Sequence, residues 1–236
     1  ANIYYFIYII LYIIRTSSGG IRMGKHVLAA VLAVLFMAAG AQAAGNEWND
    51  SFSKAKKTLE RQIYHDHRVT LYCGAAFDEK KDVAVPEGFR APKHEKRAGK
   101  VEWEHVVPAE NFGQAFPEWR EGDAQCVDKK GKVFKGRKCV EKVNREYRLM
   151  QSDMYNLYPA IGAVNALRQN YNFQMLPGEE PDFGSCGMKI ADRRAEPPIR
   201  ARGQIARTYK YMADAYAPRY RMSRQQAQLM DAWDRM

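Results

Sequence analysis

A carboxylate and an imidazole stand side by side in the segment Glu102 to Ala109, at the end of a short apolar run. Glu104 can hold a cation, and His105, whose ordinary pKa is about 6.5, can accept a proton at neutral pH. A later segment, residues 156–165, ends in Asn165, whose carboxamide oxygen could complete an oxygen-rich site of the kind that Mg²⁺ prefers. On a basic chain, these groups indicate hydrolysis of a phosphodiester.

The N-terminal part of the chain has the pattern of an export signal. A basic start after Met23, the apolar run Val27 to Ala39 and small residues up to Ala43 predict a signal peptide over residues 23–43. Residues 1–22 are interpreted as a leader translated from upstream sequence, and the alternative is a second membrane-associated segment. We therefore expect a periplasmic or secreted protein without a membrane anchor once the signal is removed.

Residues 44–236 have a length typical of one domain with a sizeable core. Three of the 37 basic residues and none of the 27 acidic ones precede residue 44, so this domain keeps 34 basic against 27 acidic side chains. The positive surplus favours polyanionic partners, nucleic acid above all, although anionic lipid or solubility alone would also account for it. We expect a monomer.

The four cysteines, Cys73, Cys126, Cys139 and Cys186, all follow the expected signal. Export to an oxidising compartment and the even count predict two disulfides, for which three pairings exist. Pairing Cys126 with Cys139 would order the Lys- and Gly-rich loop between them and contribute about 3 kcal/mol on the loop-entropy model, leaving Cys73 to pair with Cys186. Zinc binding is the competing use, but the chain has no CxxC pair or Cys/His cluster with ligand spacing.

Hydrophobic periodicity predicts an α+β fold, mainly helical with a few short strands. Apolar positions from Trp48 to Ile63 predict an amphipathic first helix, and residues 69–73 predict a short strand. A second strand over residues 101–105 is ended by a proline. Two more amphipathic helices are predicted, over residues 205–216 and over residues 223–233, where Ser223 provides a cap.

The geometry of these elements restricts the candidate site. Glu104 and His105 point to opposite faces of a regular strand, so they can serve one site only if the strand ends or bulges there. Pro159 predicts the start of a helix on which Asn165 and Arg168 share a face. Asn165 is therefore expected to face packed structure.

Three long strings, EWEHVVPAENFG, SDMYNLYPAIGAVNALRQNYNF and RARGQIARTYKYM, resemble the endonuclease I family of periplasmic and secreted bacterial nucleases. The similarity runs from about Trp48 to Trp233. The resemblance implies a ββα-metal (His-Me finger) motif, in which two short strands and a helix surround one divalent ion. It also implies sequence-nonspecific hydrolysis of DNA and often RNA, with 5′-phosphate ends, outside the cytoplasm.

The resemblance assigns a role to individual residues. His105 resembles the general base, Glu104 and Asn165 the protein ligands of the metal, and Arg137, in KGRKC, the arginine that binds the cleaved phosphate. Mg²⁺ is the expected cofactor, and Ca²⁺ or Mn²⁺ could also fill an oxygen site. Further basic residues are expected to bind the substrate backbone, although the arginines could instead cap helices or pair with acids: Lys135, Lys138, Arg168, Arg202 and Arg207.

The chain departs from the family pattern at several points. Gln151 stands where relatives carry a glutamate near the general base, and fewer cysteines are present. The chain stops at Met236, so we expect it to lack a C-terminal segment common in the family. These departures leave a second hypothesis, an exported basic nucleic-acid-binding protein that has lost catalysis. A zinc phosphoesterase would need more His and Asp ligands than this region offers.

Overall fold

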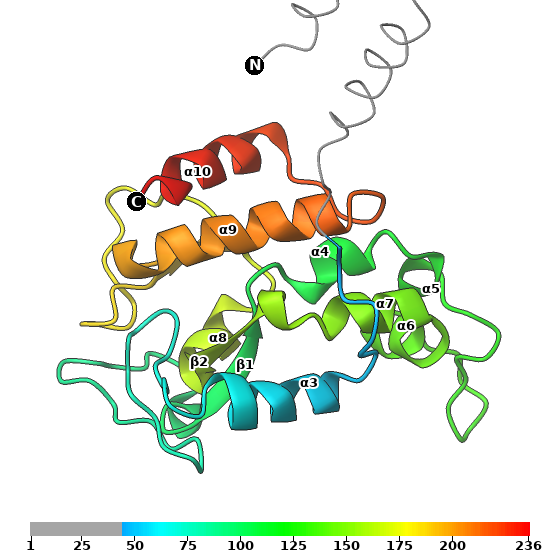
Figure 1. The fold of residues 1–236 in the computed structure, drawn as a ribbon, viewed down its shortest axis with the longest axis horizontal. Coiled ribbons are helices and arrows are strands. Elements are labelled where there is room, and N and C mark those ends of the chain that lie inside the picture. The colour runs from blue at the N-terminus through cyan, green and yellow to red at the C-terminus, as the bar shows by residue number, and fades with distance from the viewer. Residues whose placement is uncertain (1–43) are drawn as a thin grey trace, which may run out of the picture. The chain divides into compact units, whose positions relative to one another are not determined.

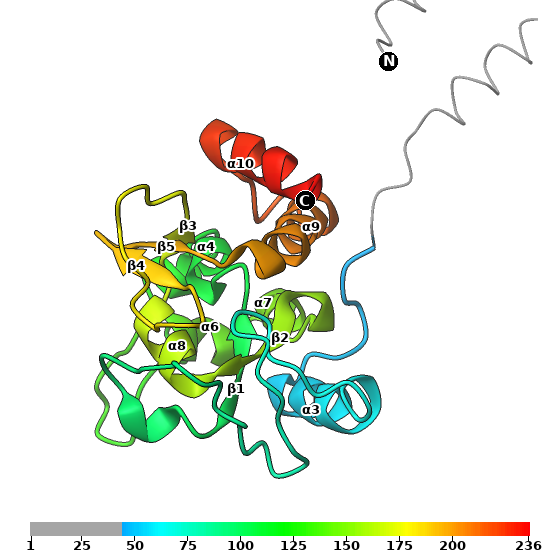
Figure 2. The ribbon, with the colours of Figure 1, turned by 90° about the vertical axis from the view of Figure 1, so that its left-hand side faces the viewer.

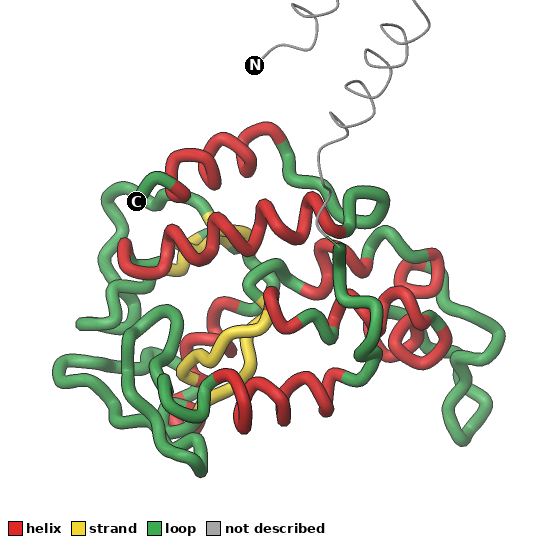
Figure 3. The backbone as a smooth tube through the Cα atoms, in the orientation of Figure 1, coloured by secondary structure: helices red, strands yellow, loops and turns green. Residues whose placement is uncertain are grey.

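The computed structural model describes residues 44–236, so the expected leader and signal segment, residues 1–43, lie outside the described residues. Helices and short strands alternate along the described part of the chain, which confirms the mixed fold (Figures 1 and 3). The α-helices are α3 (Phe52–Thr58), α4 (Ala109–Gly113), α5 (Pro117–Arg120), α6 (Arg137–Val143), α7 (Arg145–Gln151), α8 (Gly162–Arg168), α9 (Ile199–Ala215) and α10 (Arg224–Asp234). The strands are β1 (Val101–His105), β2 (Leu157–Ile161), β3 (Asn172–Phe173), β4 (Lys189–Ala191) and β5 (Arg194–Glu196). Single turns are the π-helix η1 (Leu59–Ile63) and the 3₁₀ helices η2 (Glu95–Arg97) and η3 (Met154–Asn156).

The centre of the domain is the antiparallel pair β1 and β2, followed directly by α8. Val101 pairs with Ile161 and His105 with Leu157, and the segment that connects the two strands carries α4 to α7. α8 contacts both strands, and α3 lies along the opposite side of the pair (Figure 2). The sequence prediction for residues 101–105 is confirmed, and β1 ends at His105 as the candidate site required.

The predicted helix start at Pro159 is wrong, because this residue lies inside β2 opposite Trp103. Its carbonyl accepts a hydrogen bond from Leu71 N at 2.8 Å. α8 begins at Gly162, where a Cβ would lie 2.7 Å from the carbonyl oxygen of Arg97. The helix therefore starts at a position where the chain has room only for glycine.

The predicted strand over residues 69–73 is also wrong. Val69 forms one isolated bridge with Ala76, and the residues between them reverse direction in a turn. Gly74 has φ +65°. Thr70 holds the turn closed, because its Oγ1 accepts from Ala75 N at 3.0 Å and its carbonyl accepts from Gly74 N at 3.0 Å. β-branched and aromatic residues favour a strand locally, but here the contacts of the turn decide the conformation.

The first helix is shorter than predicted. Ser51 caps α3 by accepting a hydrogen bond from Lys54 N, and among the predicted apolar positions Phe52, Ala55 and Leu59 pack on the domain. The side chains at both ends of the predicted apolar stripe are in solvent: Trp48 is 88% exposed and Ile63 is 54% exposed.

The C-terminal half adds a helical layer and a small sheet. α9 and α10 pack side by side, and Ser223 caps α10 through Gln226 N, as predicted (Figure 1). β5 lies between β3 and β4, in a three-stranded sheet that the sequence did not predict. Both disulfides form with the favoured pairing, Cys126 with Cys139 and Cys73 with Cys186. None of the helices within residues 44–236 has the length and apolar character that crossing a bilayer requires.

Candidate active site

A pocket of about 340 Å³ opens where β1 ends. It brings together the four residues to which the sequence assigned chemistry: Glu104 and His105 from β1, Arg137 from the start of α6, and Asn165 from α8. Phe52 of α3 lines the same pocket. Glu104 and Asn165, which are 61 positions apart in the chain, thus face one cavity, because the antiparallel strand pair and its following helix converge there.

His105 is held through one ring nitrogen and is free at the other. Its Nε2–H donates to the backbone carbonyl of Gln151 at 2.8 Å, and since a carbonyl only accepts, Nε2 carries the proton. No described residue binds Nδ1, which is therefore the basic nitrogen. Burial, followed by the positive charge of Arg137 and with smaller effects from Arg168 and Lys56, lowers the pKa of His105 to about 3. The imidazole is neutral at neutral pH and can accept a proton.

Glu104 is also held at one atom. Its Oε1 accepts from the Tyr72 hydroxyl at 2.7 Å and from Arg168 Nη1 at 2.9 Å, while no group within residues 44–236 donates to Oε2. Burial raises the pKa of the Glu104 carboxyl, and the ion pair with Arg168 and the hydrogen bond from Tyr72 oppose this effect. The two donors therefore fix the carboxylate and leave its second oxygen available to the pocket.

Asn165 is oriented by a carboxylate of β1. Its Nδ2 donates to Glu102 Oε2 at 2.9 Å, and Glu102 in turn binds both Nε and Nη2 of Arg97. Because Glu102 takes the amide nitrogen, the carboxamide oxygen is the atom of Asn165 that remains for a ligand. The half-buried position of Asn165, at the pocket wall, agrees only in part with the expectation of a packed environment.

Arg137 reaches the pocket from the other side. Its Nε and Nη2 donate to Gln151 Oε1 at 3.3 and 3.2 Å, and its guanidinium lies 5.6 Å from the ring centre of Phe52. Gln151 thus orients His105 with its backbone and Arg137 with its side chain. Because the carbonyl that holds His105 belongs to the main chain, a glutamine at this position keeps that support.

The remaining predicted substrate contacts fall into two groups. Lys135 and Lys138 are exposed beside Arg137. The Arg207 side chain is 60% exposed on α9 and forms an ion pair with Asp234 at 3.7 Å, so the alternative of pairing with an acid holds for this arginine. Arg168 and Arg202 are instead buried, so the structure does not place them where a nucleic acid can reach.

The buried arginines have structural partners. Arg168 binds Glu104 and donates to the carbonyls of His105 and Val106, each at 2.8 Å. Arg202 pairs with Glu196 at 2.7 Å. This corrects the prediction of phosphate binding for both, because their guanidinium groups satisfy carboxylates and carbonyls inside the domain.

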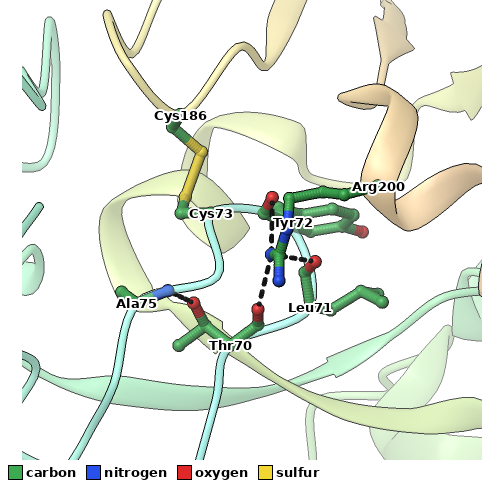
Figure 4. The surroundings of a disulfide bond; sticks show 7 residues. All are labelled: Thr70, Leu71, Tyr72, Cys73, Ala75, Cys186 and Arg200. Carbon is green, nitrogen blue, oxygen red and sulfur yellow. Dashed lines mark hydrogen bonds between the residues drawn. A yellow bond between two sulfur atoms is a disulfide. The ribbon is translucent and has the colours of Figure 1, made fainter.

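The turn that carries Tyr72 is fixed by a disulfide and an arginine (Figure 4). Cys73 bonds to Cys186, and the Arg200 guanidinium donates at 3.1 to 3.3 Å to three successive carbonyls, those of Thr70, Leu71 and Tyr72. A Cβ on Gly74 would lie 2.5 Å from that guanidinium. These contacts define the position from which Tyr72 reaches Glu104.

Sequence reasoning missed the groups that support the site. The sequence contained a signal for Glu102, because a strand places residues two positions apart, such as Glu102 and Glu104, on the same face. Tyr72 and the Gln151 carbonyl had none, since their contacts depend on how distant segments pack.

Comparison with known proteins shows the family of this chain. The family model described as Endonuclease I matches residues 49–235. An extracellular deoxyribonuclease of Aeromonas hydrophila is 40% identical over 192 residues, which cover 78% of this chain and 77% of the relative. A periplasmic deoxyribonuclease of the same organism is 38% identical and covers 78% and 74%. Endonuclease-1 of Buchnera aphidicola subsp. Acyrthosiphon pisum is 34% identical over 193 residues, or 79% and 70%. The chain belongs to the endonuclease I family and is a nuclease.

Proposed function

We propose that this protein is an exported, monomeric endonuclease that hydrolyses DNA and RNA without sequence preference, depends on one divalent cation and leaves 5′-phosphate ends. In this proposal the mature protein begins at residue 44, after the signal is removed. The names of the extracellular and periplasmic relatives support the location and DNA as the substrate. The observation that carries the proposal is that His105, Glu104, Asn165 and Arg137 line one pocket. Within the described residues, Nδ1 of His105, Oε2 of Glu104 and the carboxamide oxygen of Asn165 have no hydrogen-bond partner.

The donor set fits a hard cation such as Mg²⁺. Glu104 and Asn165 both line the pocket, and each side chain is anchored through one polar atom. No group within residues 44–236 donates to Glu104 Oε2 or to the carboxamide oxygen of Asn165. We assign β1, β2 and α8 to a ββα-metal motif on this basis. A bound divalent cation stabilises negative charge on the phosphate and on the leaving oxygen. The described residues contain no group of three or more His, Cys, Asp or Glu that could hold a metal. In this proposal Glu104 and Asn165 are the two residues that would hold the cation.

His105 acts as the general base. Its Nδ1 takes a proton from the attacking water, and the Gln151 carbonyl keeps the ring in place and stabilises the positive charge that then develops. Arg137 binds the phosphate through a planar pair of N–H groups, which a lysine lacks. Lys135, Lys138 and Arg207 attract the sugar-phosphate backbone of the substrate. Because contacts to phosphate are the same for every base, cleavage shows almost no sequence preference.

The test is cleavage by purified, oxidised protein of supercoiled plasmid and of single-stranded RNA, with Mg²⁺ and with a chelator. We expect both to be cut only with Mg²⁺, and the products to accept a kinase label only after phosphatase treatment. Binding without cutting would favour the non-catalytic hypothesis, and cutting in the chelator would contradict the metal requirement.

The base assignment is tested by His105→Ala. Turnover should fall by about 10² to 10⁴, the usual contribution of a general base, while the Kd for duplex DNA measured in chelator stays close to that of wild type. An equal loss of binding and cleavage would argue against His105 as the base.

A further inference from the structure

A second cavity, of about 470 Å³, adjoins the catalytic pocket. The two share Phe52, Trp103 and Asn165 as lining residues and therefore lie side by side. We call the second cavity the lysine groove, because α3 and the loop before β1 line it with Lys56, Lys57 and Lys81.

Two positive charges of the lysine groove, on Lys56 and Lys57, have no carboxylate partner in the part of the chain that the structure describes. Glu60 stands four and three residues after Lys56 and Lys57, a spacing at which helix side chains commonly pair. Its carboxylate instead binds Lys81 Nζ at 3.4 Å. The other carboxylate of the groove, Glu102, binds Arg97. Within residues 44–236, no Asp or Glu forms an ion pair with Lys56 or Lys57.

Phe52 connects the charges of the two cavities. Lys56 Nζ lies 4.6 Å from the centre of the Phe52 ring, and the Arg137 guanidinium lies 5.6 Å from the same centre. Lys56 lines the groove and Arg137 lines the catalytic pocket. Positively charged side chains therefore lie on both sides of the Phe52 ring, Arg137 in the catalytic pocket and Lys56 in the lysine groove.

We infer that the lysine groove binds the sugar-phosphate backbone next to the phosphate that is cleaved, with Lys56 and Lys57 each contacting one phosphate. This inference rests on the proposed function. A strand whose phosphate occupies the catalytic pocket must leave that pocket on some side, and the groove offers it unneutralised cations beside an aromatic ring. Such a combination is typical of proteins that bind nucleic-acid strands without sequence preference.

The experiment measures how DNA affinity depends on salt. Each lysine that contacts a phosphate contributes about 0.9 to the slope of log K against log salt concentration for duplex DNA. We therefore expect Lys57→Ala and Lys56→Gln each to reduce the slope by about 0.9, and the double variant by about 1.8. The readout is the anisotropy of a labelled duplex between 50 and 200 mM NaCl in chelator, with KM for plasmid in Mg²⁺ measured in parallel and expected to rise.

Lys54→Ala is the matched control. Lys54 is an exposed lysine of the same helix that lines neither cavity, and its loss should leave the slope unchanged. Lys57 is exposed, which keeps its substitution from disturbing the core. Equal slopes for wild type, Lys54→Ala and Lys57→Ala would overturn the groove assignment even where plasmid is cut. Absence of Mg²⁺-dependent cutting by wild type would instead reject the proposed function, while the slopes still test DNA binding in the groove.

Discussion

At the scale of single residues, the candidate site follows one rule at three of its four side chains: each is bound through one polar atom, and no group within residues 44–236 binds the other. His105 is held at Nε2, Glu104 at Oε1 and Asn165 at Nδ2. Holding one atom removes rotational freedom without using the atom needed for chemistry. Mutation of a residue that holds a metal ligand in place commonly lowers metal affinity by about 10- to 100-fold.

Tyr72→Phe tests this rule at Glu104. The substitution removes one hydroxyl and keeps the ring that packs against Phe173, so Glu104 loses a donor while the core keeps its shape. We expect the affinity for Mg²⁺ or Mn²⁺, measured by calorimetry, to fall by about tenfold. Tyr220→Phe is the control, because this buried tyrosine donates no hydrogen bond to Glu104. Equal metal affinity in the two variants would exclude a role for Tyr72 in positioning the carboxylate.

At the scale of elements, local pattern predicted β1, α9 and the cap of α10, but failed where distant contacts decide. Residues 69–73 have strand composition, yet Gly74 and the contacts of Arg200 turn the chain there. Pro159 resembles a helix start, yet its carbonyl and its place opposite Trp103 keep it in β2. Both wrong predictions concern segments that contact residues distant in the sequence. Local hydrophobic periodicity contains no information about such contacts.

The turn that carries Tyr72 makes a prediction about the disulfides. Removing the bond between Cys73 and Cys186 by a double serine substitution should lower the free energy of unfolding by about 2 to 5 kcal/mol and also weaken divalent-ion affinity, because Tyr72 loses its fixed position. The bond between Cys126 and Cys139 closes a shorter loop, with a sequence separation of 13 against 113 for the other bond, so its removal should lower the free energy of unfolding by less.

Urea unfolding and metal titration measure both effects. The metal affinity of the variant without the Cys126 to Cys139 bond should stay near that of wild type, since neither cysteine contacts the residues that hold Glu104. Weakening of the same size in both variants would point to a general loss of rigidity in place of a specific effect of the turn.

At the scale of the molecule, an aromatic cluster links the C-terminal helices to the site. Phe173 lies 6.3 Å from Trp233 of α10, 6.0 Å from Tyr209 of α9 and 6.2 Å from Tyr72, measured between ring centres. The Arg168 guanidinium lies 4.5 Å from the same ring. The sequence could not predict this link, because Phe173 belongs to a two-residue strand, too short to show a period.

Phe173→Leu tests whether this link reaches the site. Loss of the ring should cost about 1 to 3 kcal/mol of stability and, because Arg168 loses the surface on which it lies, should also weaken divalent-ion affinity. Phe183→Leu removes an equally buried ring that packs on Phe89, and should cost similar stability without a change in metal affinity. Thermal unfolding and calorimetry on the two variants separate the effects, since a metal affinity that falls equally in both, or in neither, would mean that Phe173 acts on the core alone.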